Sequence, residues 1–422
     1  MNDLLWPGDE RAERLFAPSA LLSAMVRVEA AWLHALVVTG AVPAAARDDL
    51  VGLVTARDVD AVASRAEASG NPVVPMLALL RERLERRNRV AAEWVHRGLT
   101  SQDVLDTALV LCARDAARRV LAELDDQVGA LVTLADRHRD DVMAGRTLTQ
   151  HAVPITFGLK AAQWLQGVLD AREDLRRATR RLPAQFGGAA GTLAATAEML
   201  SRSGSPATAK DVAADASRTL GLEPAPPWHT SRAPFTRYAD ALVLATDAWG
   251  RIANDMLLLA RPEIGELAED TVEGRGGSST MPQKANPVLS VLIRRAALAA
   301  PGLAAQLHLA AAASVDERPD GSWHIEWSTL ATLARHTVTA GSQTAELLDG
   351  LHVDTGRMAA VVKQRSSALL AEQRSIGALF DGDRGTDAPD FDPSHYLGET
   401  GTVIDRILAR ARADQAPHKE NP

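Results

Sequence analysis

The spacing of apolar residues predicts helices along most of the chain. In one representative stretch, apolar side chains recur at intervals of four, three and four residues, at Leu124, Val128, Leu131 and Ala135. That periodicity places them on one face of a helix. No run alternates apolar and polar residues for long enough to predict a sheet. The pattern therefore predicts an all-α fold.

Prolines and glycines divide the chain into long uninterrupted stretches and two breaks. Residues 76–153 and 320–388 contain no proline and predict long helices or pairs of helices. The segment Gly221–Pro234 carries four prolines, and Gly274–Pro287 is rich in glycine. Both segments are therefore predicted to be loops between helices.

These features predict three helical domains. The expected division is an N-terminal helical domain at 1–98, a central long-helix bundle at 99–345 and a small C-terminal helical domain at 346–422. Long helices gain most of their stability from packing against partners. We therefore expect the central bundle to assemble with further copies of the chain.

One helix start is marked by residue type. Thr100 and Ser101 precede Asp103, and apolar positions follow at once, at Val104, Leu105, Ala108 and Leu109. Hydroxyl and carboxylate side chains are preferred at helix N-termini because they bind the unpaired backbone N–H groups. A helix is therefore predicted to begin at these residues.

Composition excludes several classes of protein. A net charge of −8 argues against a nucleic-acid surface. The single cysteine, Cys112, excludes a disulfide framework. The N-terminal residues lack a signal-peptide pattern, and no stretch approaches about 20 unbroken apolar residues, so we expect a cytoplasmic protein that spans no membrane. No two of the 11 histidines lie within four residues of each other, so no metal site is predicted. We found no cofactor motif either.

The glycine-rich break carries candidate chemistry. Gly274, Gly276 and Gly277 give the backbone freedom to approach an anion. Arginine supplies 41 of the 46 basic residues, so Lys284 in this loop is unusual. A compact ammonium group in such a loop suggests contact with a ligand. Composition alone fits a mobile surface loop equally well.

Three segments together resemble one enzyme superfamily. Gly277–Pro287 (GSSTMPQKANP) is similar to the signature of the fumarase/aspartase superfamily. His96–Asp106 (HRGLTSQDVLD) and Gly145–Pro154 (GRTLTQHAVP) resemble its first and second motifs, in the expected order. The resemblance covers nearly the whole chain and implies a cofactor-free enzyme acting on small di- or tricarboxylates.

The resemblance also implies roles for individual residues. Ser278 is expected to be the base that removes a proton next to a carboxylate, and Lys284 to stabilise the anions formed. A serine hydroxyl ionises only with such help. The remaining residues are expected to bind substrate: His96, Thr100, Ser101, Thr147, Gln150, Ser279, Met281 and Asn286. Helix capping is a second explanation for Thr100 and Ser101.

Two departures from the superfamily pattern limit the chemistry. Fumarases and adenylosuccinate lyases carry a histidine and a glutamate where this chain has Leu148 and Val291. Apolar side chains cannot relay protons. A reaction that adds water or expels an amine needs such a relay, whereas a carboxylate that closes onto a double bond is already ionised near neutral pH. Lactone-forming cycloisomerisation can therefore dispense with the pair.

Further segments resemble the bacterial 3-carboxy-cis,cis-muconate cycloisomerases: Phe157–Trp164, Gln185–Leu193, Trp228–Arg232 and Trp323–Trp327. The first expectation is therefore lactonisation of 3-carboxy-cis,cis-muconate to 4-carboxymuconolactone, in the β-ketoadipate pathway of aromatic catabolism. The resemblance also implies a homotetramer whose active sites are shared between subunits. His229 and His324, in two of these segments, are candidates for loop or pocket residues.

Other functions stay open. Cycloisomerases usually have arginine where this chain has Ala285, so the substrate could be a different or smaller acid. A lyase that expels a small stable anion such as nitrite from a succinate derivative also needs no acid for its leaving group. Elimination of an amine to give fumarate is a further variant. A catalytically silent structural relative is disfavoured by the intact Ser278, Lys284 and Asn286.

Overall fold

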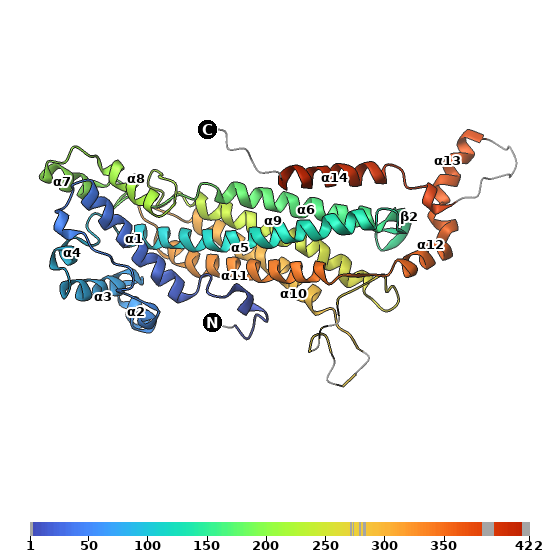
Figure 1. Cartoon of the computed structure of the whole chain (residues 1–422), viewed down its shortest axis with the longest axis horizontal. Helices are drawn as coiled ribbons and strands as arrows, with labels where there is room; N and C mark the ends of the chain where they lie inside the picture. The colour runs from blue at the N-terminus through green and yellow to red at the C-terminus, as the bar shows by residue number, and fades with distance from the viewer. Residues whose placement is uncertain are drawn as a thin grey trace. The chain divides into compact units, whose positions relative to one another are not determined.

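A computed structural model describes residues 3–270, 272, 274–277, 280–281, 284–381 and 392–415 (Figure 1). Most of these residues are helical, which confirms the helical character of the fold. The long helices are α5 (Ser101–Arg137), α6 (Phe157–Thr179), α9 (Ala233–Leu259), α10 (Val288–Ala312) and α11 (Gly321–Asp349). The shorter helices are α1 (Pro18–Val38), α2 (Val59–Ala66), α3 (Val73–Glu85), α4 (Arg89–Trp94), α7 (Ala194–Ser203), α8 (Ala209–Thr219), α12 (Thr355–Leu369), α13 (Ala371–Asp381) and α14 (Thr400–Gln415). Single turns of 3-10 helix occupy Asp9–Ala12, Ala44–Ala46, Ala56–Asp58, Glu67–Ser69 and Pro393–His395.

The chain divides into two compact units. The first comprises residues 1–120, 174–243 and 299–339, and the second comprises residues 121–173, 244–298 and 340–422. The expected division at residues 98 and 345 stays a prediction.

In the first unit, α1 packs against α8 and carries the core residue Trp32. The Trp32 side chain is fully buried, and its Nε1–H donates to the carbonyl oxygen of Arg97 at 2.8 Å. A buried indole N–H needs such a partner. The contact therefore ties the segment before α5 to the core of this unit.

The core of the second unit is built on apolar faces and buried tryptophans. The four periodic residues predicted to share a face of α5 are all buried. Trp249 donates its Nε1–H to Gln127 Oε1 at 2.7 Å, and Gln127 donates to the carbonyl oxygen of Gly341 at 2.9 Å. A Cβ at Gly341 would lie 3.0 Å from the Trp249 ring, so glycine permits the close approach.

The predicted breaks are confirmed. Helix α9 begins at Ala233, within the last two residues of the proline-rich segment, and α10 begins at Val288, directly after the glycine-rich segment. Helix α5 begins at Ser101, as predicted. The cap contact that the structure shows is made by Asp103, whose Oδ2 accepts the Thr100 backbone N–H at 3.0 Å.

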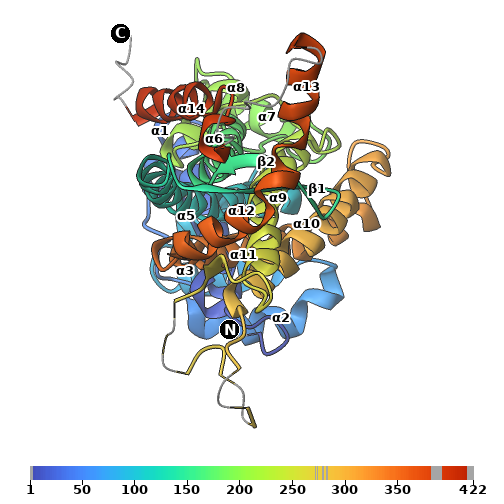
Figure 2. The same ribbon diagram turned by 90° about the vertical axis from the view of Figure 1, so that its right-hand side faces the viewer.

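The prediction that the chain forms no β-strands was wrong. Strands β1 (Val142–Thr147) and β2 (Gln150–Thr156) form an antiparallel hairpin with an irregularity between Ala144 and Arg146. Strands β3 (Leu267–Ala268) and β4 (His352–Val353) form a second short pair. Helix α12 lies against the β1–β2 hairpin (Figure 2). The contact contains a small core of Ala144, Val362 and Leu369.

Among the described residues, two helices are long and apolar enough to cross a membrane by length and composition alone. In α1, 67% of the most apolar window is buried inside the protein, as in the core helix of a globular fold. In α10 the buried share is 33%. Val291, Leu298 and Leu309 of α10 are 51–73% exposed.

Candidate active site

In the first unit, the first motif is organised around a buried carboxylate. Asp103 has no exposed surface. It accepts five hydrogen bonds of 2.9–3.1 Å, from the backbone N–H groups of Thr100, Gly187 and Gly188 and from Gln185 Nε2 and His229 Nε2. Satisfying a buried carboxylate in this way makes the surrounding segments rigid. Asp103 therefore fixes the start of α5, with Thr100 and Ser101, against residues 185–188 and 229.

A second buried network lies one turn further along α5. Arg232 donates to both Asp106 oxygens at 2.7 and 3.1 Å and to both Glu326 oxygens at 2.6–3.1 Å. Trp323 Nε1 donates to Asp106 Oδ1 at 2.8 Å. Burial alone would lower the pKa of Arg232, but the two carboxylates hold it above its ordinary value. Burial also raises the pKa of the Glu326 carboxyl, although Arg232 opposes that shift.

Two of the segments that resemble the cycloisomerases supply residues of these buried networks. Trp228–Arg232 and Trp323–Trp327 meet at Asp106. His229 is 4% exposed and bonded to Asp103, so it belongs to the framework rather than to an open pocket. His324 bonds to the carbonyl oxygens of Asp320 and Gly70 at the surface of the same unit.

His96 lies just before this helix start. Its backbone has φ of +67°, in the left-handed region. Its Nδ1 lies 2.7 Å from Oε1 of Glu29, a buried residue of α1. Nearby Gly98 has φ of +85°, and a Cβ there would lie 2.5 Å from Thr196 Oγ1. The segment 96–98 is therefore held in one conformation by its neighbours.

The second motif forms the tip of the β1–β2 hairpin in the second unit. Thr147 and Gln150 flank a two-residue turn made by Leu148 and Thr149, both with positive φ. All four residues are exposed, and Leu148 is 96% exposed. Non-glycine residues rarely adopt this conformation, so the turn is strained. The hairpin thus presents Thr147 and Gln150 outward on a fixed support.

A buried ion pair anchors that support. Arg146 binds both carboxylate oxygens of Glu266, at 2.8 and 2.9 Å, and the Glu266 side chain is completely buried. His151 pairs with Arg146 across the hairpin. Burial and the charges of Arg146 and Arg365 lower the pKa of His151. A lowered pKa reduces the fraction of His151 that carries a second ring proton at a given pH.

The third motif is the loop before α10. Asn286 donates its backbone N–H and its side-chain amide to the carbonyl oxygen of Gly276, both at 2.9 Å. Gly276 has φ of +71°, and a Cβ there would lie 2.6 Å from the backbone carbonyl oxygen of Asn286. The Lys284 backbone N–H donates to the carbonyl oxygen of Met281 at 3.0 Å, and both side chains are exposed. Ser278 and Ser279 lie outside the described residues.

The segment around β3 holds both the hairpin and the loop. Glu266 anchors the hairpin, and Glu269 accepts the backbone N–H groups of Leu289 and Ser290 at 3.1 and 2.8 Å, with the Ser290 hydroxyl at 2.6 Å. Glu269 therefore caps the start of α10. Sequence reasoning missed both glutamates, and also Asp103 and Asp106 as organising residues.

The predicted site residues therefore fall into two groups. His96, Thr100 and Ser101 lie together at the start of α5 in the first unit. Thr147, Gln150 and the described loop residues Met281, Lys284 and Asn286 lie in the second unit. The structure leaves their roles in binding and catalysis as predictions.

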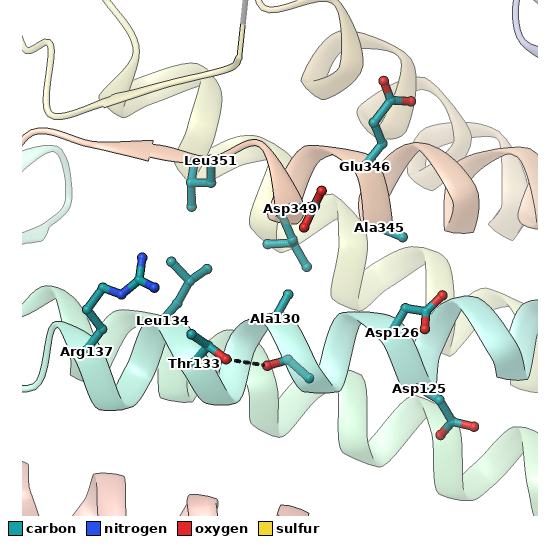
Figure 3. Close-up of a pocket in the computed structure, with 12 residues that line it drawn as sticks. Asp125, Asp126, Ala130, Thr133, Leu134, Arg137, Ala345, Glu346, Asp349 and Leu351 are labelled. Carbon is teal, nitrogen blue, oxygen red and sulfur yellow. Dashed lines mark hydrogen bonds between the residues drawn. The ribbon is translucent and has the colours of Figure 1, made fainter.

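The second unit contains a cavity of about 710 Å³ between α5 and α11 (Figure 3). Four acidic residues line it: Asp125, Asp126, Glu346 and Asp349. Such a lining repels carboxylates. A smaller cavity of about 290 Å³ lies beside the hairpin and is lined by Arg146, His151, Arg357 and Arg365 among others. The larger cavity contains none of the predicted site residues.

Comparison with known proteins identifies the relatives of the chain. Residues 37–302 match the model of the lyase family. Nitrosuccinate lyase from Streptomyces davaonensis is 40% identical, covering 94% of this chain and 92% of that protein. The 3-carboxy-cis,cis-muconate cycloisomerase of Pseudomonas aeruginosa is 36% identical, covering 94% of both.

Solved structures give the same result. The 3-carboxy-cis,cis-muconate lactonizing enzyme from Pseudomonas putida matches with a TM-score of 0.82 and 32% identity, over 95% of this chain and 97% of that one. The family model covers more than half of the chain, and the relatives match it almost from end to end. The chain therefore belongs to the fumarase/aspartase superfamily of lyases.

Proposed function

We propose that this enzyme eliminates a small, stable anion such as nitrite from a succinate derivative and releases fumarate. The observation that carries the proposal is the lack of a proton donor at the leaving-group positions of the superfamily. Leu148 and Val291 occupy those positions. Both side chains are apolar, and both are exposed on the surface of the single chain. Burial and the charges of Arg146 and Arg365 lower the pKa of the nearby His151. An anion such as nitrite, whose conjugate acid is already ionised at neutral pH, can depart without receiving a proton.

The loop composition favours this substrate over a tricarboxylate. Ala285 stands where cycloisomerases of the family usually have arginine, so the loop lacks one cation. A nitro-substituted succinate carries two carboxylates rather than three and therefore needs fewer fixed positive charges. The similarity to nitrosuccinate lyase supports the same choice. For these two reasons we place elimination ahead of the cycloisomerisation that the sequence first suggested.

The proposed reaction balances as a β-elimination. The Ser278 oxygen takes the proton from the carbon next to one carboxylate, and that C–H electron pair passes into an aci-carboxylate. Lys284, with N–H groups of the loop, stabilises the extra negative charge. The electron pair then forms the carbon–carbon double bond as the C–N bond breaks. Nitrite leaves with the bonding electrons, so the products are fumarate, nitrite and one proton.

Cycloisomerisation remains the second candidate because several relatives and the matched solved structure carry that activity by name. It is also compatible with Leu148 and Val291. One experiment separates the two. The purified enzyme is given nitrosuccinate or 3-carboxy-cis,cis-muconate under the same conditions, and nitrite, fumarate and lactone are measured. We expect nitrite and fumarate in equal amounts from the first substrate. Lactone formation with no nitrite release would establish the cycloisomerase instead.

We also propose that the enzyme is a homotetramer with active sites shared between subunits. The exposed apolar residues of α10 support an assembly through this helix, since Val291, Leu298 and Leu309 are 51–73% exposed. The separation of the predicted residues into two groups is compatible with sharing.

Mixing two inactive variants tests that assembly. Thr100→Ala and Ser278→Ala each damage a different part of the site. If sites are shared, subunits exchanged between the two variants should regain part of the wild-type activity, because some sites then contain no substituted residue. Each variant taken alone through the same exchange procedure is the control. A stable, active monomer in light scattering would contradict the proposal.

A further inference from the structure

The pair formed by His96 and Glu29 has an unusual distribution of exposure. The side chain of Glu29, on α1, is fully buried, whereas that of His96 is 16% exposed. The Nδ1 of His96 lies 2.7 Å from Glu29 Oε1. By contrast, His229 and its partner Asp103 are both buried, with 3% and 0% exposed. In the His96–Glu29 pair, the imidazole of His96 is therefore the part that a ligand can reach.

Burial makes Glu29 dependent on this histidine. Within the described part of the chain, Glu29 Oε2 has no hydrogen-bond partner. A carboxylate removed from water is costly unless a donor or a positive charge faces it. His96 is the partner that the structure provides. An arrangement that leaves one carboxylate oxygen unsatisfied stabilises the fold poorly, so a functional reason for Glu29 is needed.

Helix α1 fixes the position of His96 at two points. Glu29 holds the ring, and Trp32, one turn later, holds the carbonyl oxygen of Arg97. These contacts maintain the left-handed backbone of His96, four residues before Thr100. Because Nδ1 is committed to Glu29, Nε2 is the ring atom left to bind a ligand. Suppose that one proton is added to a pair of neutral His96 and ionised Glu29. Nε2 of His96 then carries a hydrogen, whether the proton between the two side chains lies on Nδ1 or on Glu29.

We propose that Glu29 is a positioning residue that holds His96 so that Nε2–H donates to a carboxylate of the substrate. This assignment rests on the proposed function only in requiring a dicarboxylate ligand, which is the substrate class of the superfamily. It gives Glu29 a role that its place on α1, 67 residues before His96, conceals in the sequence. The negative charge of Glu29 offsets the positive charge of the proton that His96 takes up when the anion binds.

Fumarate binding, measured by calorimetry, tests the assignment independently of nitrite release. Hydrogen bonds to charged groups contribute about 1.5–3 kcal/mol, so we expect His96→Gln to weaken fumarate binding about 10- to 100-fold. Glu29→Gln keeps an acceptor for Nδ1 but removes the charge, and should weaken binding about 10-fold. In the His96→Gln background, Glu29→Gln should have little further effect, because Glu29 acts through His96. Glu82→Gln, the same substitution at an exposed ion pair with Arg86, is the matched control and should bind normally.

Thermal unfolding of the same variants separates positioning from a purely structural role. A Glu29→Gln enzyme that binds fumarate as tightly as wild type would overturn the proposal, whatever its stability. Additive losses in the double variant would do the same, since they would mean that Glu29 acts without His96. A wild-type enzyme that binds no fumarate would also overturn it. Failure of nitrite release alone would overturn the proposed reaction and leave this assignment standing.

Discussion

Replacing Ser278 by alanine is expected to lower kcat by about 100- to 10,000-fold, the usual contribution of a general base. The substitution removes the oxygen that accepts the proton but leaves the carboxylate contacts of Lys284 and Asn286. Substrate affinity should therefore change far less than kcat. Steady-state kinetics on the purified variant, with the substrate that the wild-type enzyme turns over, measure both quantities.

Two neighbouring substitutions are the controls for that result. Ser279→Ala should have a milder effect, because Ser279 is assigned to binding rather than to proton transfer. Lys284→Ala should weaken both binding and kcat, because its charge acts on the substrate and on the intermediate. A Ser278→Ala enzyme with near-normal kcat would end the assignment of Ser278 as the base.

Replacing Arg232 by methionine is expected to lower the free energy of unfolding by about 3–5 kcal/mol. The guanidinium is buried between Asp106 and Glu326, so its removal leaves two carboxylates without their cation. Methionine keeps much of the length of the side chain, so loss of charge should dominate over loss of packing. Denaturant unfolding followed by circular dichroism measures the change.

Arg86→Met is the matched control, because Arg86 forms an exposed ion pair with Glu82. Exposed pairs contribute about 0–1 kcal/mol, so this variant should be close to wild type in stability. Equal stability losses in the two variants would show that the buried network has no special importance. Arg232→Met should also lower activity, because Asp106 lies on the helix whose start carries Thr100 and Ser101.

The helical fold could be predicted because its signals are local. The periodic apolar residues of α5 and the proline- and glycine-rich breaks determine the structure of the residues next to them. The structure confirms both the helix and the breaks. The β1–β2 hairpin lacked such a signal. Its turn consists of Leu148 and Thr149 rather than the asparagine and glycine that mark such turns, and Pro154 lies within β2. Packing against α12 stabilises it instead.

The site was predicted as motifs, but its supporting residues were not. Thr100, Thr147 and Lys284 stand in stretches whose residue types identify them. Glu29, Glu266 and Glu269 are single charged residues outside those stretches, and their importance depends on contacts across long sequence separations. Asp103 was noticed only as part of a helix start. Its bonds to Gly187, Gly188 and His229 become visible only when the chain is folded.

Departure of the leaving group without receiving a proton can be tested on one carbon skeleton. Nitrosuccinate, aspartate and malate differ in the group that must leave, and amine and hydroxide need a proton donor whereas nitrite does not. The measurement is kcat/KM for fumarate formation from each. We expect the value for nitrosuccinate to exceed the other two by at least about 100-fold, the low end of what a general acid contributes. Comparable values for aspartate or malate would contradict the claim, because they would require a proton donor where Leu148 and Val291 stand.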